Sequence, residues 1–312
     1  MGRQLGLFGD AYRKTIDDHA ALTELAARLP AHVRFGTSSW TFPEWRSLVY
    51  VETEDSLEEY ARHPLFRTVG MDRTFYAPIS ARDLSAYAVQ LPAGFRAISK
   101  VWSEITTPVF PKHERFGVRA GQINERFLDA ELFTEQIAAP FQQAFADHVG
   151  PFVLEVPRSP TKLDPDAFAD ALGRFFERVP ASLDYAVELR DPTLLVPRYF
   201  EVLAASRATH VFNWWTRMPS IAEQVAIPGA LREGTRVVVR LMVPPDRKYE
   251  QLKKEWAPFD RMRAPNEAMR SDVADLIRHG GDAGCELFVI ANNKAEGCAP
   301  LTVRALAERI AR

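Results

Sequence analysis

Eight short apolar runs recur along this chain, and a stretch with helical spacing of its apolar residues follows each of them. In a parallel β/α barrel every strand is followed by a helix that covers it, so this alternation predicts such a barrel. The predicted strands are Val33–Trp40, Thr68–Tyr76, Phe95–Trp102, Phe152–Pro157, Tyr185–Arg190, Ala208–Trp215, Arg236–Met242 and Cys285–Asn293. We therefore expect an α/β fold, an eight-stranded parallel β/α (TIM-type) barrel with an N-terminal helical extension.

The predicted helices lie between these runs. They span Ser56–Arg62, Ala81–Leu91, Gln122–His148, Pro165–Arg178, Pro197–Ser206, Ser220–Val225, Asn266–His279 and Leu301–Ala311. Residues 10–29 also have helical spacing, and Pro30 ends that helix. We expect residues 1–32 to form an N-terminal extension, with a terminal peptide motif and a helix, and residues 33–312 to form the barrel domain. With 312 residues and 46% hydrophobic content, the chain can bury one large core.

Composition excludes several classes of protein. The formal net charge is −2, so no overall positive field attracts nucleic acid. Two cysteines, Cys285 and Cys298, provide neither a disulfide framework nor a four-ligand zinc site. No apolar run approaches the ~20 residues that a membrane-spanning helix needs. We expect a cytoplasmic protein without a membrane partner.

Several strand-end motifs are specific enough to compare with a known family. They are Phe35–Trp45 (FGTSSWTFPEW), Thr74–Tyr76 (TFY), Gly94–Lys100 (GFRAISK), Ala186–Arg190 (AVELR) and Asn292–Asn293. From about Arg34 to the C-terminus, the chain resembles the YecE-like family, a domain of unknown function numbered seventy-two. The resemblance implies a β/α barrel of the same broad kind as sugar isomerases and apurinic endonucleases, and it implies no particular reaction.

The chain departs from the family pattern at three places. Gly70 and Asp72 stand where the family usually has Glu and Asn before Thr-Phe-Tyr. Thr107 stands where a His is common, and the seventh strand reads Arg240-Leu241-Met242-Val243 in place of Arg-Leu-His-Gly. The resemblance therefore does not imply a histidine-dependent mechanism for this chain.

Charged residues at the predicted strand ends suggest a site at the mouth of the barrel. Glu188 and Arg190 are two residues apart, so both side chains project from one face of their strand. Lys100 and Arg240 occupy similar positions on two other strands. We expect Glu188 to be a general acid or base, and the three cations to hold a phosphate or carboxylate. The alternative is an internal salt-bridge network that only closes the barrel mouth.

The predicted catalytic residues are Glu188, Lys100 and Asp72. The predicted substrate-binding residues are Arg190, Arg240, Ser39, Trp40, Tyr76, Trp214, Asn292 and Asn293. A lysine in apolar surroundings can form a Schiff base with a carbonyl substrate, but for Lys100 the interpretation as an anion-binding charge is stronger. The seven histidines are scattered without a metal-binding spacing, and no glycine-rich phosphate loop is present, so we expect neither a metal nor a cofactor. The alternative is a hard cation such as magnesium on Asp72, Glu155 and Glu188, for which the nearby Lys and Arg side chains compete.

Aromatic residues gather at the same strand ends. Four of the six tryptophans, Trp40, Trp102, Trp214 and Trp215, lie there, and with Tyr76 they can form a stacking wall for a sugar or nucleobase. Plain packing of the barrel mouth is the alternative interpretation.

The N-terminal extension carries a short motif of its own. Gln4, Leu5, Leu7 and Phe8 belong to the sequence Gln-Leu-Gly-Leu-Phe, which resembles the pentapeptide that binds the bacterial replication sliding clamp. An exposed apolar cluster at a chain end either binds a partner or folds back onto its own domain.

Three functions are consistent with these features. The first is a metal-independent enzyme that acts on a small anionic, sugar- or nucleotide-like substrate at the strand ends. The second is an accessory or nuclease-like protein of DNA metabolism that the pentapeptide recruits to the clamp. The third is a non-catalytic scaffold, which is favoured if all strand-end charges pair internally. The sequence alone leaves open whether the chain is an enzyme and whether it binds nucleic acid.

Overall fold

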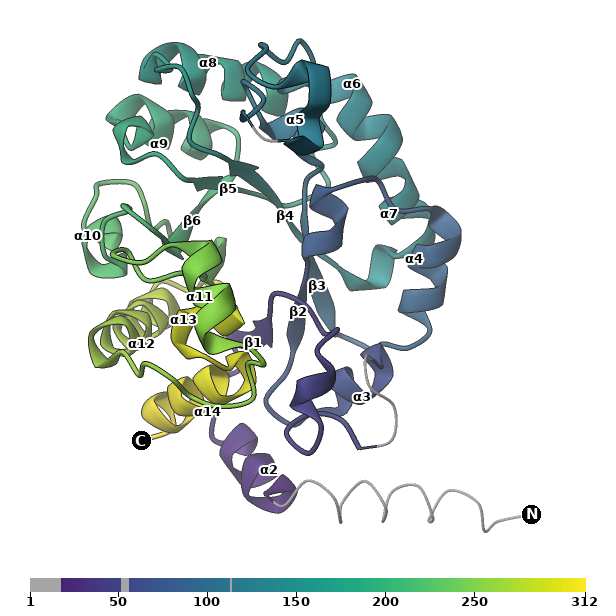
Figure 1. The fold of residues 1–312 in the computed structure, drawn as a ribbon, viewed down its shortest axis with the longest axis vertical. Coiled ribbons are helices and arrows are strands. Elements are labelled where there is room, and N and C mark those ends of the chain that lie inside the picture. Colours follow the sequence, from purple (N-terminus) through teal and green to yellow (C-terminus); the bar gives the residue numbers. More distant parts are fainter. Residues whose placement is uncertain (1–17, 52–55, 113) are drawn as a thin grey trace.

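The computed structural model describes residues 18–51, 56–112 and 114–312, and it shows a ring of eight parallel strands surrounded by helices (Figure 1). The strands are β1 (Val33–Thr37), β2 (Thr68–Met71), β3 (Arg96–Lys100), β4 (Val149–Val156), β5 (Tyr185–Leu189), β6 (Thr209–Trp214), β7 (Arg236–Leu241) and β8 (Glu286–Ala291). Their order is β1-β8-β7-β6-β5-β4-β3-β2, and all pairs are parallel. The predicted barrel is therefore confirmed.

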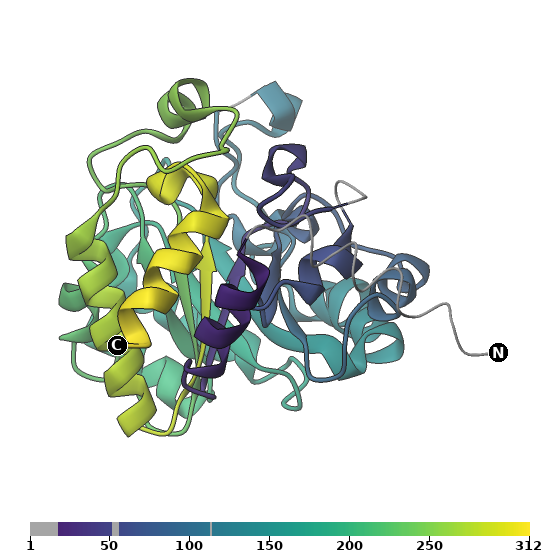
Figure 2. The ribbon, with the colours of Figure 1, turned by 90° about the horizontal axis from the view of Figure 1, so that it is seen from below.

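Helices surround this ring (Figure 1). They are α2 (His19–Ala27), α3 (Leu57–Arg62), α4 (Ala81–Ala88), α5 (Ser103–Thr106), α6 (Ala130–Phe133), α7 (Ala139–Ala144), α8 (Pro165–Phe176), α9 (Pro197–Ala205), α10 (Ile221–Val225), α11 (Tyr249–Trp256), α12 (Glu267–Asp282), α13 (Asn293–Glu296) and α14 (Ala299–Ile310). Of these helices, α11 and α13 lie over the carboxyl end of the ring (Figure 1, Figure 2). Within the described residues, no helix is both long and apolar enough to cross a membrane.

Shorter helical turns occur between these elements. They are η1 (Pro43–Trp45), η2 (Asp72–Phe75), η3 (Glu114–Arg119), η4 (Thr134–Ala138), η5 (Ala146–His148) and η6 (Pro192–Leu194). The N-terminal helix α2 packs beside α14 (Figure 2), and Asp18 forms an ion pair of 2.7 Å with Arg304 there.

Several predicted elements are shorter in the structure, and two of them differ most from the prediction. The second strand was expected to reach Tyr76 but ends at Met71, because the Thr74 hydroxyl donates to the Met71 carbonyl at 2.6 Å and stabilises the turn η2. The predicted helix 122–148 begins at Ala130, where the Asp129 carboxylate caps it, and contains a π-helical turn just before Pro140.

Two apolar layers form the core. The barrel interior contains Ile98, Val153, Ala186, Val211, Val238, Phe288 and Ile290. A larger layer fills the space between strands and helices. Because side chains alternate along a strand, the interior layer also fixes which residues near the strand ends point inward.

The ring closes between β1 and β2 through few hydrogen bonds. Phe35 and Phe66 form an isolated bridge, and the buried Tyr60 hydroxyl accepts from the Thr37 amide at 2.8 Å and donates to the Thr68 carbonyl at 3.2 Å. At Gly36 the strands approach so closely that a Cβ atom would lie 2.0 Å from the Thr68 carbonyl oxygen. The absence of a side chain at Gly36 therefore allows the barrel to close.

We predict that Gly36→Ala destabilises the fold by about 2 kcal/mol or more, because backbone atoms must move to relieve the clash. Gly173→Ala is a matched control within α8, where the nearest atom lies 3.5 Å from the added Cβ. It should stabilise the fold by roughly 0.5–1 kcal/mol, since glycine is unfavourable inside a helix. Urea denaturation measures both. Equal effects of the two substitutions would contradict this account of closure.

Candidate functional site

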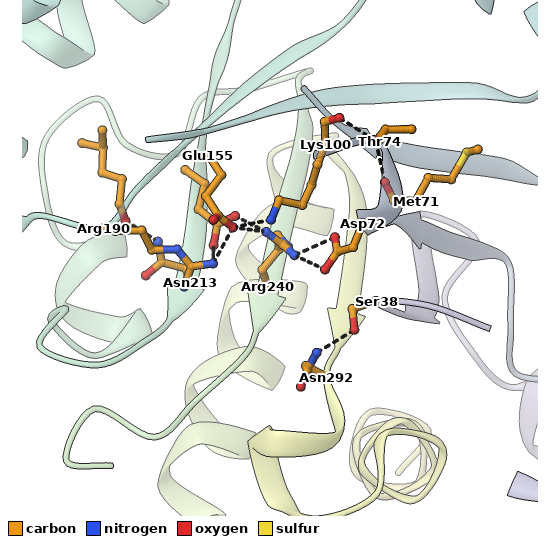
Figure 3. A network of polar contacts seen from close by, with 12 residues as sticks. Ser38, Met71, Asp72, Thr74, Lys100, Glu155, Arg190, Asn213, Arg240 and Asn292 are labelled. Atoms are coloured by element: carbon orange, nitrogen blue, oxygen red, sulfur yellow. Dashed lines mark hydrogen bonds and ion pairs between the residues drawn. The ribbon is translucent and has the colours of Figure 1, made fainter. Parts of the chain in front are cut away.

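Six charged side chains meet at the carboxyl ends of the strands (Figure 3). This polar cluster consists of Asp72, Lys100, Glu155, Glu188, Arg190 and Arg240. Its strand residues lie two positions beyond interior apolar residues, as in Ile98 and Lys100, so the alternation of each strand points them inward. The predicted convergence of Lys100, Glu188, Arg190 and Arg240 is present in the structure.

Arg240 is at the centre of the polar cluster and is fully buried. Its Nη2 donates to both carboxylate oxygens of Asp72 at 2.9 and 3.0 Å, and its Nη1 donates to Glu155 at 3.0 Å and also to Glu188. Burial alone would lower the pKa of Arg240, but the charges of Asp72, Glu188 and Glu155 outweigh burial and raise it. Arg240 is therefore a permanent cation that joins three carboxylates.

The other two cations share the same carboxylates. Arg190 Nη2 lies 2.9 Å from Glu155 and 2.6 Å from Glu188, and Lys100 Nζ lies 2.9 Å from Glu155. Burial alone would raise the pKa of Glu155, but Lys100, Arg190 and Arg240 hold it well below its usual range. Glu155 is consequently an ionised acceptor at neutral pH, and it cannot deliver a proton as a general acid there.

The cluster holds equal numbers of positive and negative groups, three of each. The sequence predicts three cations beside one carboxylate, and this prediction is wrong because Asp72 and Glu155 also join the polar cluster. Asp72 begins η2 directly after β2, and Glu155 lies on β4, so both reach Arg240 of β7 from across the ring. Lys100 and Arg240 are thus occupied by carboxylates.

Among the three cations of the polar cluster, Arg190 has the most buried donors without a partner: two, compared with one, Nε, on Arg240 and none on Lys100. Its side chain is 5% exposed, and its Nε and Nη1 atoms have no hydrogen-bond partner among the described residues. The guanidinium carbon lies 3.7 Å from the centroid of the Trp215 ring, which holds the planar group in place. Arg190 therefore has two buried donors whose hydrogen-bonding capacity is unsatisfied among the described residues.

A cavity of about 510 Å³ adjoins the cluster at Glu155 and Arg190. Its walls come from the segments that follow β4, β5, β6 and β7, which is the end of a barrel where substrates bind. Its lining includes two acidic residues, Glu155 and Asp246, and five basic ones. The basic residues are Arg158, Arg190, Arg217, Arg247 and Lys248. The cavity therefore has an excess of positive charge even though the cluster beneath it is balanced.

The aromatic residues are divided between this cavity and the outer core. Trp215 lines the cavity, whereas Trp214 is buried in the outer apolar layer because adjacent residues of a strand face opposite sides. Trp40 packs edge-on against Tyr87 of α4 at 5.2 Å between ring centroids. Tyr76 is 68% exposed beside Phe75. Of the predicted stacking wall, Trp215 lines this cavity, whereas Trp40, Trp102, Trp214 and Tyr76 are not among its lining residues.

The remaining predicted residues support loops. Asn292 Nδ2 donates to the Ser38 hydroxyl at 2.8 Å, and the Asn293 Oδ1 accepts from the Ala299 amide at 2.8 Å. Ser39 Oγ lies 2.9 Å from Thr41 Oγ1. Asn292 and Ser38 thus join the ends of β8 and β1 at the mouth (Figure 3), while Asn293 positions the start of α14.

Lys294, which sequence reasoning did not select, is buried at the mouth with a side chain over two aromatic rings. Its position directly after Asn292 and Asn293 was the only signal in the sequence. Within the described residues, no group of three or more His, Cys, Asp and Glu side chains is arranged to hold a metal ion. The clamp-binding motif at Gln4, Leu5, Leu7 and Phe8 lies outside the described residues and stays a prediction.

Comparison with known proteins agrees with this architecture. Residues 34–312 match the family model described as a protein of unknown function, DUF72, and the chain belongs to this family. The family is the one that the YecE-like resemblance indicated. No curated protein matches the chain.

Two solved structures of DUF72 family proteins have a similar fold. The protein from Thermotoga maritima MSB8 has a TM-score of 0.64 and 19% identity, and the match covers 90% of this chain and 99% of that one. The protein from Enterococcus faecalis V583 has a TM-score of 0.63 and 17% identity, and the match covers 89% of this chain and 95% of that one. At such identities the likeness establishes the fold.

We predict that Arg240→Gln destabilises the protein by about 3–5 kcal/mol at pH 7, because it leaves buried carboxylates without their shared cation. Arg278→Gln is a matched control, since Arg278 is 71% exposed and pairs only with Asp275 among the described residues. Its effect should stay below about 1 kcal/mol. Chemical denaturation measures both, and equal effects would argue against the central position of Arg240.

The effect of Arg240→Gln should depend on pH. The folded pKa of Glu155 is depressed, so its stabilising contribution is present above its unfolded pKa and is lost as pH falls through the folded pKa. Removing one cation raises that folded pKa and reduces this contribution. The difference in stability between wild type and variant should therefore shrink on acidification below about pH 4. A difference that is constant with pH would contradict the ion-pair origin.

Proposed function

We propose that this chain is an enzyme that binds a small anionic, sugar- or nucleotide-like substrate in the cavity at the carboxyl ends of β4 to β7 and acts without a metal ion. The observation that carries the proposal is the pair of unpartnered buried donors on Arg190. Leaving donors unpaired in the interior is unfavourable, and phosphate or carboxylate oxygens are the acceptors that fit a guanidinium best.

The size and charge of the cavity support the same substrate class. A volume of about 510 Å³ is in the range of small-molecule sites and is suited to a sugar phosphate or a nucleotide. Arg217 and Lys248 line the cavity and form no ion pair with another described residue, so their charges are available. Trp215 adds an apolar surface against which a sugar or base can pack.

The polar cluster has a positioning role in this proposal. Glu188 is fully buried and contacts Arg190 and Arg240, so it orients Arg190, while Arg240 fixes the carboxylates. Glu155 lines the cavity and is ionised, and it accepts hydrogen bonds from substrate hydroxyl groups. With each carboxylate already engaged by a cation, none is free to provide the ligand set of a hard metal ion.

We predict that inorganic phosphate, ribose 5-phosphate or a nucleoside monophosphate raises the melting temperature of the wild-type protein. The double variant Arg217→Gln/Lys248→Gln should lose most of this shift, because it removes two cations of the cavity without touching the cluster. Arg198→Gln removes a half-exposed arginine of α9 that pairs with Asp170 on α8, and it should leave the shift unchanged.

Two results would count against the proposal. One is that none of the three ligands stabilises the wild type, and the other is an equal shift in the double variant. Stabilisation by a DNA oligonucleotide alone would favour the second function, an accessory protein of DNA metabolism.

A further inference from the structure

Two lysines are buried at the mouth of the barrel, and they differ in one respect. Lys100 Nζ lies 3.8 Å from the Phe75 ring centroid and 2.9 Å from a Glu155 carboxylate oxygen. Lys294 Nζ lies 4.1 Å from the Tyr249 ring centroid and 5.1 Å from that of Phe259, and it forms no ion pair with any described residue. Both have aromatic neighbours, but only Lys100 has a carboxylate.

The backbone holds Lys294 firmly at this place. It lies in α13 directly after β8, and the Asn292 side chain caps the helix by accepting from the Lys294 amide at 3.0 Å. The residue is only 5% exposed. Lys294 does not itself line the cavity, but its aromatic neighbour Tyr249 does, which places the amine next to the cavity wall.

The burial of Lys294 favours a neutral amine. Burial, followed by the charge of Lys253, lowers its pKa to about 8, against the opposing effects of Glu250 and Asp72. Glu250 and Lys253 lie on α11 with Tyr249, and Asp72 follows β2 and is already paired with Arg240. At pH 7.5 roughly a quarter of such amines are unprotonated, compared with about one in a thousand for an ordinary lysine.

We propose that Lys294 is a nucleophilic amine that forms a Schiff base with the carbonyl group of an anionic substrate. This inference rests on the proposed function, because it assigns the anionic group to Arg190, Arg217 and Lys248 and adds a carbonyl to the substrate class. A desolvated lysine without a carboxylate partner is the arrangement that makes an amine reactive at neutral pH.

The reaction is balanced without a further reactant. The Nζ lone pair attacks the carbonyl carbon, and the electron pair of the broken C–O π bond moves to oxygen. A proton moves from nitrogen to that oxygen to give the carbinolamine. Loss of the hydroxyl group with a proton, as water, forms the C=N bond. An amine and a carbonyl thus give an imine and water, with no change of oxidation state.

Reductive trapping tests this assignment. The full-length protein is treated with glycolaldehyde phosphate or with uncharged propanal in the presence of cyanoborohydride, and modified lysines are quantified by peptide mass spectrometry. We expect Lys294 to react about tenfold faster or more than Lys100 and exposed Lys162 at pH 7.5. Its rate should level off above about pH 8, whereas the rate at Lys162 continues to rise.

Two variants provide controls. Lys294→Arg keeps the positive charge and should abolish modification at this position, with an unchanged circular dichroism spectrum as the check on folding. Lys162→Arg should leave the modification of Lys294 unchanged. If neither aldehyde modifies Lys294 faster than Lys162, the assignment is wrong, even if phosphate stabilises the protein.

The two probes separate this inference from the proposed function. Faster modification of Lys294 by the phosphate-bearing aldehyde supports both. Equally fast modification by the two aldehydes supports the reactive amine but contradicts the anionic cavity. The double variant Arg217→Gln/Lys248→Gln tests the origin of this preference. If the variant no longer prefers the phosphate-bearing aldehyde while its rate with propanal is unchanged, the two cations cause the preference.

Discussion

The interaction on which this structure depends is the contact of one buried guanidinium with three carboxylates. Glu155 and Glu188 are paired side by side on β4 and β5, and two like charges in such a register repel one another. Arg240 reaches them from β7 and also binds Asp72 beyond β2. Taking these ions out of water is costly, and their attraction offsets that cost only when the whole set is present. The cluster therefore specifies a closed barrel in one register.

The equal number of cations and carboxylates in the polar cluster determines which cations remain for a ligand in the adjoining cavity. Because Lys100 and Arg240 are occupied by carboxylates, a ligand does not compete for them, and they form a rigid floor. Arg190 and Glu155 belong to both regions, and Arg190 is the cation of the pair: its Nη2 belongs to the cluster, and its Nε and Nη1 have no partner among the described residues. The structure thus separates the charges that hold the barrel mouth together from those that can bind a substrate.

Strand periodicity predicted the barrel and the meeting of Lys100, Glu188, Arg190 and Arg240, because both follow from alternation along parallel strands. It could not show that Asp72 and Glu155 neutralise these cations, since that pairing crosses the ring. Trp214 and Trp215 are adjacent and face opposite sides, so the sequence could not show that Trp215, and not Trp214, lines the cavity. The basic residues of the cavity wall lie in irregular segments, which have no periodicity to indicate where a side chain points.

The opposite end of the barrel shows why burial is the distinguishing property of the site. There Arg236 bridges Asp184 and Glu286, and Arg34 also pairs with Glu286. These side chains are 22–43% exposed, so water screens their charges and the ion pairs contribute little. At the carboxyl end Arg240 and Glu188 are 0% exposed and Arg190 is 5% exposed, and only Asp72 at the edge of the polar cluster, with 27%, is as exposed as these side chains. In that environment each hydrogen bond is electrostatically stronger, and a donor without a partner, such as Arg190 Nε, has a correspondingly strong preference for a charged acceptor.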